Sequence, residues 1–104
     1  MIRLRDNADA LEHSALYDQL TDCKNRKALD WAYTEKLEKY FPLAVVMCDL
    51  NGLKEINDQK GHDAGDKFIV QTAQTLKSVF GKRHVYRLGG DEFIAVLPNI
   101  THPA

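Results

Sequence analysis

Residues 85–98 read VYRLGGDEFIAVLP, two apolar segments separated by a pair of glycines. Val85 to Leu88 and Phe93 to Leu97 are rich in the aliphatic and aromatic residues that favour strands, and a proline closes the second segment. Gly89 and Gly90 tolerate the positive φ angles of a two-residue turn. The stretch therefore predicts a β-hairpin with two acidic residues at its tip.

A second strand and a long helix are predicted before this hairpin. Leu43 to Cys48 is a short, valine-rich run without alternation, which predicts a strand covered on both faces. Ile69, Ala73, Leu76 and Phe80 recur at helical spacing, and this helix is expected to end near Gly81. A strand followed by a crossover helix normally returns beside its starting strand. We therefore expect Asp49, at the end of the first strand, to lie next to the hairpin.

The remaining segments are shorter or more polar. Residues 26–40 are predicted as a helix because Leu29, Tyr33, Leu37 and Tyr40 recur at helical spacing before Pro42. Residues 18–25 are loop-like, and Thr21, Asp22 and Asn25 are available to cap that helix. Residues 52–58 form a helical turn that residues 61–65 interrupt. A narrow apolar stripe (Leu4, Ala8, Leu11, Ala15) predicts an amino-terminal helix that packs on the domain or pairs with another copy.

The composition is that of one globular domain. The chain has 104 residues, of which 44 % are hydrophobic and 28 % charged. Lys and Arg number 14 against 15 Asp and Glu, so the net charge of -1 gives no reason to expect nucleic acid or a membrane as a partner. Cys23 and Cys48 match neither a zinc site nor a disulfide framework, which favours reduced thiols in the cytoplasm.

Three carboxylates are candidates for a metal site. Asp49 ends the first strand, and Asp91 and Glu92 occupy the hairpin tip, so all three are expected at one edge of the sheet. Mg²⁺ prefers a few carboxylates completed by water and substrate phosphates. This arrangement indicates a magnesium–nucleotide site. The alternative is that Asp91 and Glu92 are solvated turn residues.

The segment after the first strand is a candidate phosphate site. It reads DLNGLKEIND over residues 49–58, with Gly52 and Lys54 at the start of a helical turn. Unsatisfied backbone N–H groups at a helix start and a lysine can bind one anion together. The alternative for Lys54 is a solvent-facing lysine. An EF-hand is excluded because the alternating ligands and the closing glutamate are missing.

Four motifs in order carry a family resemblance. Residues 89–93 spell GGDEF, and they follow DQLTDCKNR (residues 18–26), DLNGLKEIND (residues 49–58) and GHDAGD (residues 61–66). The chain thus resembles the GGDEF family of diguanylate cyclases. The resemblance implies an α/β (α+β) fold, with helices on a ferredoxin-like sheet of the nucleotide-cyclase type. Residues 1–16 are then an amino-terminal stalk or linker helix, and residues 17–104 a GGDEF domain incomplete at its carboxyl end.

The resemblance also implies roles for individual residues. Metal ligands are Asp49, the carbonyl of Leu50, Asp91 and Glu92, holding Mg²⁺ or Mn²⁺, and either Asp91 or Glu92 assists deprotonation. Asn57 and Asp66 read guanine, although both also suit helix capping. Lys54 and the backbone of Gly52 and Leu53 contact phosphates, and Gly89 and Gly90 let the nucleotide approach the hairpin.

The implied reaction condenses two GTP molecules into cyclic di-GMP and pyrophosphate. Because each protomer holds one GTP, catalysis needs a two-fold homodimer. The alternative is an inactive truncated module that binds GTP or mediates association, and a third possibility is a cyclase for other nucleotides. The family's inhibitory product site is not expected, because Phe80 and Arg83 replace its Arg and Asp. A regulatory domain is expected upstream in the parent protein.

Overall fold

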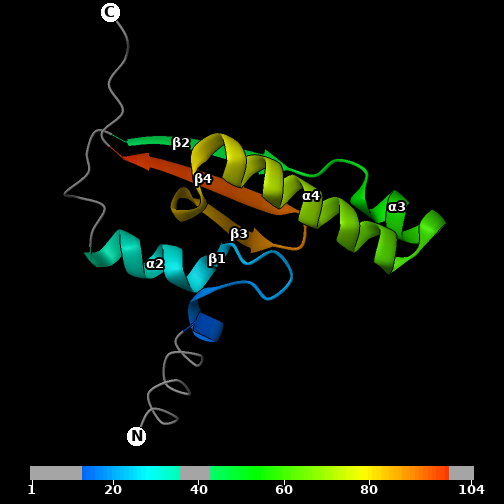
Figure 1. Cartoon of the computed structure of the whole chain (residues 1–104), viewed down its shortest axis with the longest axis horizontal. Coiled ribbons are helices and arrows are strands. Elements are labelled where there is room, and N and C mark those ends of the chain that lie inside the picture. The colour runs from blue at the N-terminus through cyan, green and yellow to red at the C-terminus, as the bar shows by residue number, and fades with distance from the viewer. Residues whose placement is uncertain (1–12, 36–42, 99–104) are drawn as a thin grey trace, which may run out of the picture.

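The computed structural model describes residues 13–35 and 43–98, which form a sheet with helices on both faces (Figure 1). Residues 13–16 are helical. The elements that follow are β1 (Lys24–Asn25), α2 (Arg26–Glu35), β2 (Leu43–Asp49), α3 (Leu53–Lys60), α4 (His62–Phe80), the 3₁₀ turn η2 (Lys82–His84), β3 (Val85–Gly89) and β4 (Glu92–Pro98). This is the mixed α/β architecture that the sequence predicts.

The sheet has the strand order β1-β3-β4-β2. β3 and β4 form the predicted antiparallel hairpin, and β1 runs parallel to β3. β2 is antiparallel to β4 along its whole length, from Leu43 opposite Pro98 to Asp49 opposite Glu92. The crossover from β2 therefore does not return to a neighbouring strand as predicted, because β4 is inserted between β2 and β3. This split β-α-β arrangement is typical of ferredoxin-like folds.

Two core clusters cover the two faces of the sheet. In the first, Val85 and Phe93 pack with Ile69 and Ala73 of α4, and Phe93 and Val85 are fully buried. In the second, Tyr86 and Val96 pack with Ala28 of α2. Since successive residues of a strand point to opposite faces, α4 and α2 lie on opposite sides of the sheet.

Helix α4 follows the predicted apolar stripe closely. Leu76 and Phe80 are half-buried against the same cluster as Ile69 and Ala73. The helix ends as predicted at Gly81, which has a φ of 93° and donates its N–H to the carbonyl of Lys77 at 2.9 Å. Its beginning differs from the prediction. Only Gly61, with a φ of 89°, separates α3 from α4, whereas Gly65 lies inside α4.

Helix α2 is capped by Asn25, one of the three predicted candidates. The Asn25 Oδ1 accepts the N–H of Ala28 at 2.9 Å, which satisfies a donor of the first turn. Ala28 is the buried residue of α2, whereas Tyr33 of the predicted stripe is 72 % exposed. Residues 36–40 of the predicted helix, and the amino-terminal stripe apart from Ala15, lie outside the described residues.

Strand β2 is confirmed, but the prediction that both of its faces are covered is wrong for the described part of the chain. Val45 is 53 % exposed and Met47 is 70 % exposed. β2 ends the strand order, so it has one hydrogen-bonded neighbour among the described strands.

Both cysteines are free thiols, with Cys23 buried and Cys48 half-buried. Among the described helices, none has the length and apolar character needed to span a bilayer.

Candidate nucleotide and metal site

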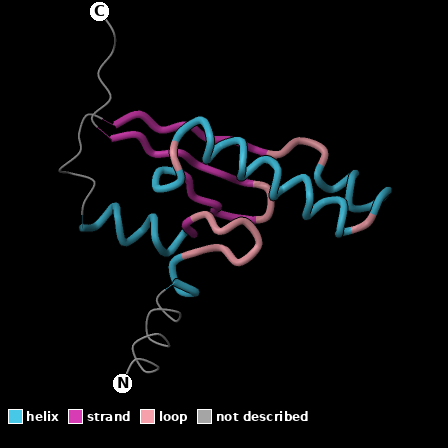
Figure 2. The backbone as a smooth tube through the Cα atoms, in the orientation of Figure 1, coloured by secondary structure: helices cyan, strands magenta, loops and turns pink. Residues whose placement is uncertain are grey.

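The end of β2 and the tip of the β3–β4 hairpin meet at one end of the sheet (Figure 2). Asp49 and Glu92 are direct cross-strand partners. The N–H of Leu50, which is 8 % exposed, donates to the carbonyl of Asp91 at 2.9 Å. The prediction that Asp49 lies beside the hairpin is confirmed, although the neighbouring strand is β4.

The side chains of this cluster are less tightly gathered than the sequence predicts. Within residues 13–35 and 43–98, no group of three or more His, Cys, Asp or Glu side chains is arranged to hold a metal ion. The backbone nevertheless pairs the Asp49 and Glu92 positions. Two carboxylates fit the kind of Mg²⁺ site that water and substrate phosphates complete. The donor set therefore suits a metal that arrives with a nucleotide.

The two hairpin glycines do not adopt the backbone conformation that the sequence predicts for them. The predicted positive φ angles are wrong, because neither Gly89 nor Gly90 is among the positive-φ residues. The turn is formed by Gly90 and Asp91, with an irregular register between Arg87 and Gly89. A Cβ atom added at either glycine meets no described atom within 4 Å. The fold itself therefore does not require glycine at these two positions.

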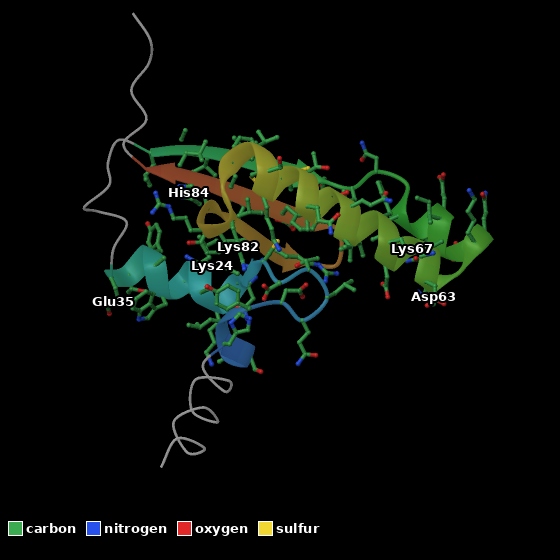
Figure 3. All side chains as sticks on the ribbon, viewed as in Figure 1. Lys24, Glu35, Asp63, Lys67, Lys82 and His84 are labelled. Atoms are coloured by element: carbon green, nitrogen blue, oxygen red, sulfur yellow. The ribbon has the colours of Figure 1, made fainter. Side chains whose placement is uncertain are left out.

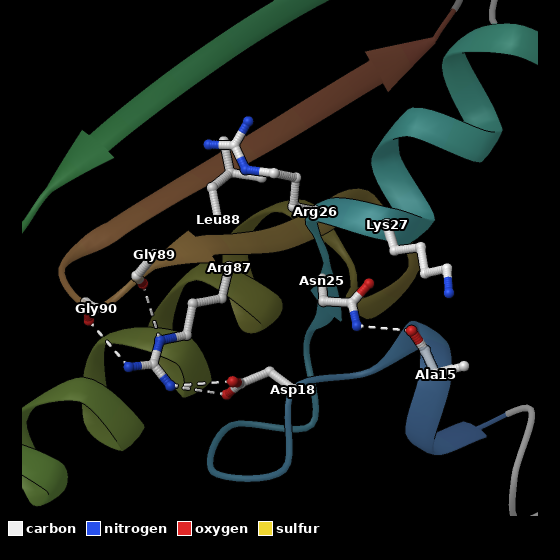
Figure 4. A pocket seen from close by; sticks show the side chains of 9 residues that line it. All are labelled: Ala15, Asp18, Asn25, Arg26, Lys27, Arg87, Leu88, Gly89 and Gly90. Carbon is white, nitrogen blue, oxygen red and sulfur yellow. Dashed lines mark hydrogen bonds and ion pairs between the residues drawn. The ribbon is translucent and has the colours of Figure 1, made fainter.

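The Arg87 side chain is hydrogen-bonded to the backbone of the hairpin tip (Figure 4). Its Nε donates to the carbonyl of Gly89 at 3.1 Å, and its Nη2 donates to the carbonyl of Gly90 at 3.0 Å. Its Nη1 donates to both carboxylate oxygens of Asp18, at 3.1 and 2.9 Å. The same residues line a cavity of about 420 Å³ between the hairpin and the start of α2, together with Ala15, Asn25, Arg26, Lys27 and Leu88.

The Asp18 carboxylate also organises the turn that leads into β1. Thr21 donates to Asp18 Oδ2 from its backbone N–H at 2.9 Å and from its hydroxyl at 2.7 Å. Cys23 in turn donates its N–H to Thr21 Oγ1 at 3.2 Å, and Lys77 of α4 donates to the carbonyl of Thr21. Partial burial raises the pKa of Asp18, but the hydrogen bonds from Thr21 and Arg87 outweigh it and hold the pKa below its ordinary value.

Sequence reasoning missed this link between Asp18 and Arg87. The motif DQLTDCKNR contains Asp18, and Arg87 stands two residues before the glycine pair. The available signal was an acidic residue in one motif and a basic residue shortly before another. No local pattern connects them, because 69 positions separate Asp18 from Arg87. The same network contains Cys23, whose thiol has a raised pKa because of its burial.

The predicted phosphate contacts lie at the start of α3. Gly52 precedes the helix with a φ of 83°, a left-handed conformation that favours glycine, and no side chain caps the helix. Lys54 is exposed in the first turn, and Leu53 is half-buried against the first core cluster. This segment follows Leu50, which is hydrogen-bonded to the hairpin tip, so the structure brings Lys54 to the same end of the sheet.

The two predicted guanine-reading residues lie on adjacent helices. Asn57 lies inside α3 and Asp66 inside α4, so neither has the capping role that was the alternative for them. The Asn57 amide rests against Gly65, the residue before Asp66. The structure therefore places the Asn57 amide next to the residue that precedes Asp66.

The two residues considered for a product site lie at the end of α4 and in η2. Phe80 is half-buried against the core, and Arg83 is exposed in η2. Lys24 donates to the carbonyl of Arg83 at 3.2 Å, and Lys82 pairs with Asp22 at 3.1 Å. Figure 3 labels Lys24 of β1 and Lys82 and His84 of η2. Burial, together with the charges of Arg83 and Lys24, lowers the pKa of His84.

A family model described as the diguanylate cyclase GGDEF domain matches residues 15–104. Together with the hairpin and the strand order, this match shows that the chain belongs to the GGDEF family. The resemblance noted from the four motifs is confirmed.

Individual relatives agree with this assignment. Diguanylate cyclase TpbB of Pseudomonas aeruginosa (strain UCBPP-PA14) is 39 % identical, with 98 % of this chain and 25 % of TpbB covered. The coiled coil and GGDEF domain of DgcB from Caulobacter crescentus, solved in complex with c-di-GMP, has a TM-score of 0.83 at 30 % identity, covering 95 % of this chain and 55 % of that one. The isolated GGDEF domain of TpbB has a TM-score of 0.71 at 36 % identity, covering 79 % and 51 %.

This chain spans a small part of its curated relatives. It covers 25 % of TpbB and 16 % of the Bacillus subtilis protein YtrP. The comparisons therefore establish the family and the fold of the matched region.

Proposed function

We propose that this chain binds GTP with Mg²⁺ or Mn²⁺ at the end of β2 and the hairpin, and that two copies condense two GTP molecules into cyclic di-GMP. One observation supports this most directly. The Asp49 and Glu92 positions are paired beside two glycines that the fold does not require. Glycines without a structural reason leave the backbone open to a ligand, and the paired acids attract the cation that accompanies a triphosphate.

Each part of the nucleotide has a matching group in this proposal. Asp49, the Leu50 carbonyl, Asp91 and Glu92 hold the metal, which supplies charge neutralisation at the phosphoryl oxygens. Lys54 and the N–H groups around Gly52 and Leu53 bind phosphate oxygens. Asn57 and Asp66 complement the carbonyl and N–H groups of guanine, and the base reaches them across Gly89 and Gly90.

The reaction is a displacement at phosphorus. The 3′-hydroxyl oxygen of one GTP attacks the α-phosphate of the other, and pyrophosphate leaves with the electrons of the broken P–O bond. Asp91 or Glu92 accepts the proton of the hydroxyl. Because each copy holds one GTP, two copies related by a two-fold axis form both bonds.

The setting proposed for this site is the cytoplasm, where GTP is available and where Cys23 and Cys48 remain thiols. The partners are then GTP and a second copy, without nucleic acid or direct membrane contact. An upstream regulatory domain is proposed for the parent protein, because the matched region is one part of longer relatives such as TpbB.

A second candidate function is a GTP-binding or association module without turnover. It is favoured by the exposed apolar residues Val45 and Met47 on the last strand of the described sheet. Strands at a sheet edge readily pair with another chain.

Incubation of the purified chain with GTP and Mg²⁺ separates the two candidates. We expect cyclic di-GMP to accumulate, and Asp91→Ala to abolish it. Asp30→Ala, an exposed position on α2, is the matched control and keeps wild-type turnover. Saturable GTP binding without any product supports the module. Equal binding of GTP and ATP supports the third possibility, a cyclase for other nucleotides.

A further inference from the structure

Gly65 occupies a position where the fold gains nothing from glycine except space. It lies in α4, which runs from His62 to Phe80, and it is buried. Glycine weakens a helix relative to alanine because it loses more conformational freedom on folding. Its φ lies outside the left-handed region, so the backbone conformation is open to alanine.

The space at Gly65 is filled by one side chain. A Cβ atom added there overlaps Asn57 Oδ1, and it lies 2.8 Å from Asn57 Cγ and 3.4 Å from Nδ2. The obstacle is therefore the whole terminal amide of a half-buried asparagine on α3. A side chain at position 65 would therefore displace that amide from its place against α4.

Backbone hydrogen bonds place Asn57 and Gly65 on either side of Gly61. The carbonyl of Asn57 accepts the N–H of Gly61 at 3.0 Å, and the carbonyl of Gly61 accepts the N–H of Gly65 at 3.3 Å. Asn57 and Gly65 therefore lie one helical turn before and after Gly61, the single residue between α3 and α4.

The contact orients the amide without using its hydrogen-bonding capacity. Within residues 13–35 and 43–98, the Asn57 amide makes no hydrogen bond, and no buried side-chain nitrogen or oxygen lacks a partner. Its carbonyl and amino groups therefore remain available to a ligand. Asp66, the next residue after Gly65, is exposed on the same turn of α4.

We propose that Gly65 is a positioning residue for base recognition: by admitting the Asn57 amide, it sets that amide beside Asp66 in the orientation that reads guanine. This inference rests on the proposed function, since Asn57 and Asp66 contact guanine only if the chain binds GTP. Gly65 touches no substrate and acts through Asn57.

The test is a double-mutant cycle with Gly65→Ala and Asn57→Ala, read by nucleotide titration and by thermal unfolding. Gly65→Ala is expected to lower GTP affinity roughly tenfold or more and to remove the preference for GTP over ATP. Asn57→Ala has the same effect, and the double variant loses no further affinity. Affinity for Mg²⁺-pyrophosphate stays unchanged in every variant, because the phosphate and metal groups are elsewhere. Asp63→Ala, in the same turn of α4, keeps wild-type affinity.

Thermal unfolding reports on the packing independently of any nucleotide. Gly65→Ala lowers the Tm in the unaltered chain because the added methyl group displaces Asn57. In the Asn57→Ala background the same substitution raises the Tm, because the space is vacant and alanine favours the helix. The double variant therefore stays folded even where Gly65→Ala alone is too unstable to study.

The outcomes separate this inference from the proposed function. Wild-type GTP affinity and selectivity in Gly65→Ala overturn the positioning role alone. A Tm that falls equally in both backgrounds also overturns it, because the Asn57 amide is then not the obstacle. Failure of the unaltered chain to bind GTP overturns the proposed function, and the recognition role falls with it.

Discussion

Arg87 and Asp18 form a two-pronged ion pair in which one guanidinium nitrogen donates to both carboxylate oxygens, at 3.1 and 2.9 Å. The other two nitrogens of Arg87 donate to the carbonyls of Gly89 and Gly90. A single side chain therefore connects the turn before β1 to the tip of the hairpin. The side chains of Arg87 and Asp18 are only 13 % and 24 % exposed, so water competes weakly for these bonds.

Replacement of Arg87 by lysine is expected to destabilise the chain by about 2 kcal/mol, because an ammonium group cannot reproduce the planar set of charged hydrogen bonds. The free energy of unfolding in urea measures this. Arg83→Lys is the matched control, since Arg83 is exposed in η2, and we expect it to change stability by less than about 0.5 kcal/mol. Equal effects of the two substitutions contradict the role given to Arg87.

The stability of the chain is expected to fall in acid partly through Asp18. Its pKa is lower in the folded chain than in the unfolded chain, so the unfolded state binds the proton more readily. The contribution is fully present above the ordinary carboxyl pKa of about 4 and is lost as the pH falls through the lowered value. Asp18→Asn should flatten the dependence of unfolding free energy on pH between about pH 5 and pH 2. Parallel curves for the two proteins count against this assignment.

Part of the acid dependence is expected to survive in Asp18→Asn. Asp22 also has a lowered pKa, caused mainly by hydrogen bonds from His13 and Lys82. The His13 Nε2 lies 2.8 Å from Asp22 Oδ1, but both side chains are about half exposed. Solvent weakens this interaction, so the residual dependence should be the smaller of the two.

The hairpin glycines and Gly52 are expected to respond oppositely to alanine. Gly89→Ala and Gly90→Ala should change the free energy of unfolding by less than about 0.5 kcal/mol, because the added Cβ meets no described atom and the backbone is not left-handed. Gly52→Ala should lower the free energy of unfolding by about 1–2 kcal/mol because the φ of Gly52 is 83°.

Under the proposed function, the two hairpin variants nevertheless lose GTP affinity by roughly tenfold or more, about 1.4 kcal/mol. Calorimetric titration with GTP and Mg²⁺ provides the second reading, and unchanged affinity would argue against ligand approach at the hairpin.

Local patterns predicted the elements that depend on neighbouring residues. The hairpin, helix α4 and the cap at Asn25 follow from period, turn residues and helix ends within a few positions. The pairing of Asp49 with the hairpin was also predicted, although through the wrong neighbouring strand. Connection rules describe the commonest return of a crossover, and they do not reveal that a later strand enters between the two.

The parts that were missed depend on distant residues or on space. The Asp18–Arg87 pair joins positions that share no local pattern, and the space left by Gly65 is filled by a side chain on another helix. The exposure of Val45 and Met47 was missed because an apolar run indicates burial without showing what covers the strand. The positive φ angles at Gly89 and Gly90 were expected because glycine adopts them readily. Glycine adopts negative φ angles equally readily, so its presence does not determine the backbone conformation.

The position of β4 has a consequence for how the chain assembles during synthesis. β4 is the last described strand to leave the ribosome, yet it lies in the interior of the sheet, with β2 on one side and β3 on the other. Among the described strands, β2 therefore has no hydrogen-bonded partner until residues 92–98 have been synthesised. A nascent chain that ends before Glu92 cannot form the Asp49–Glu92 pair. The two carboxylates therefore come together only late in synthesis, when β4 joins the sheet.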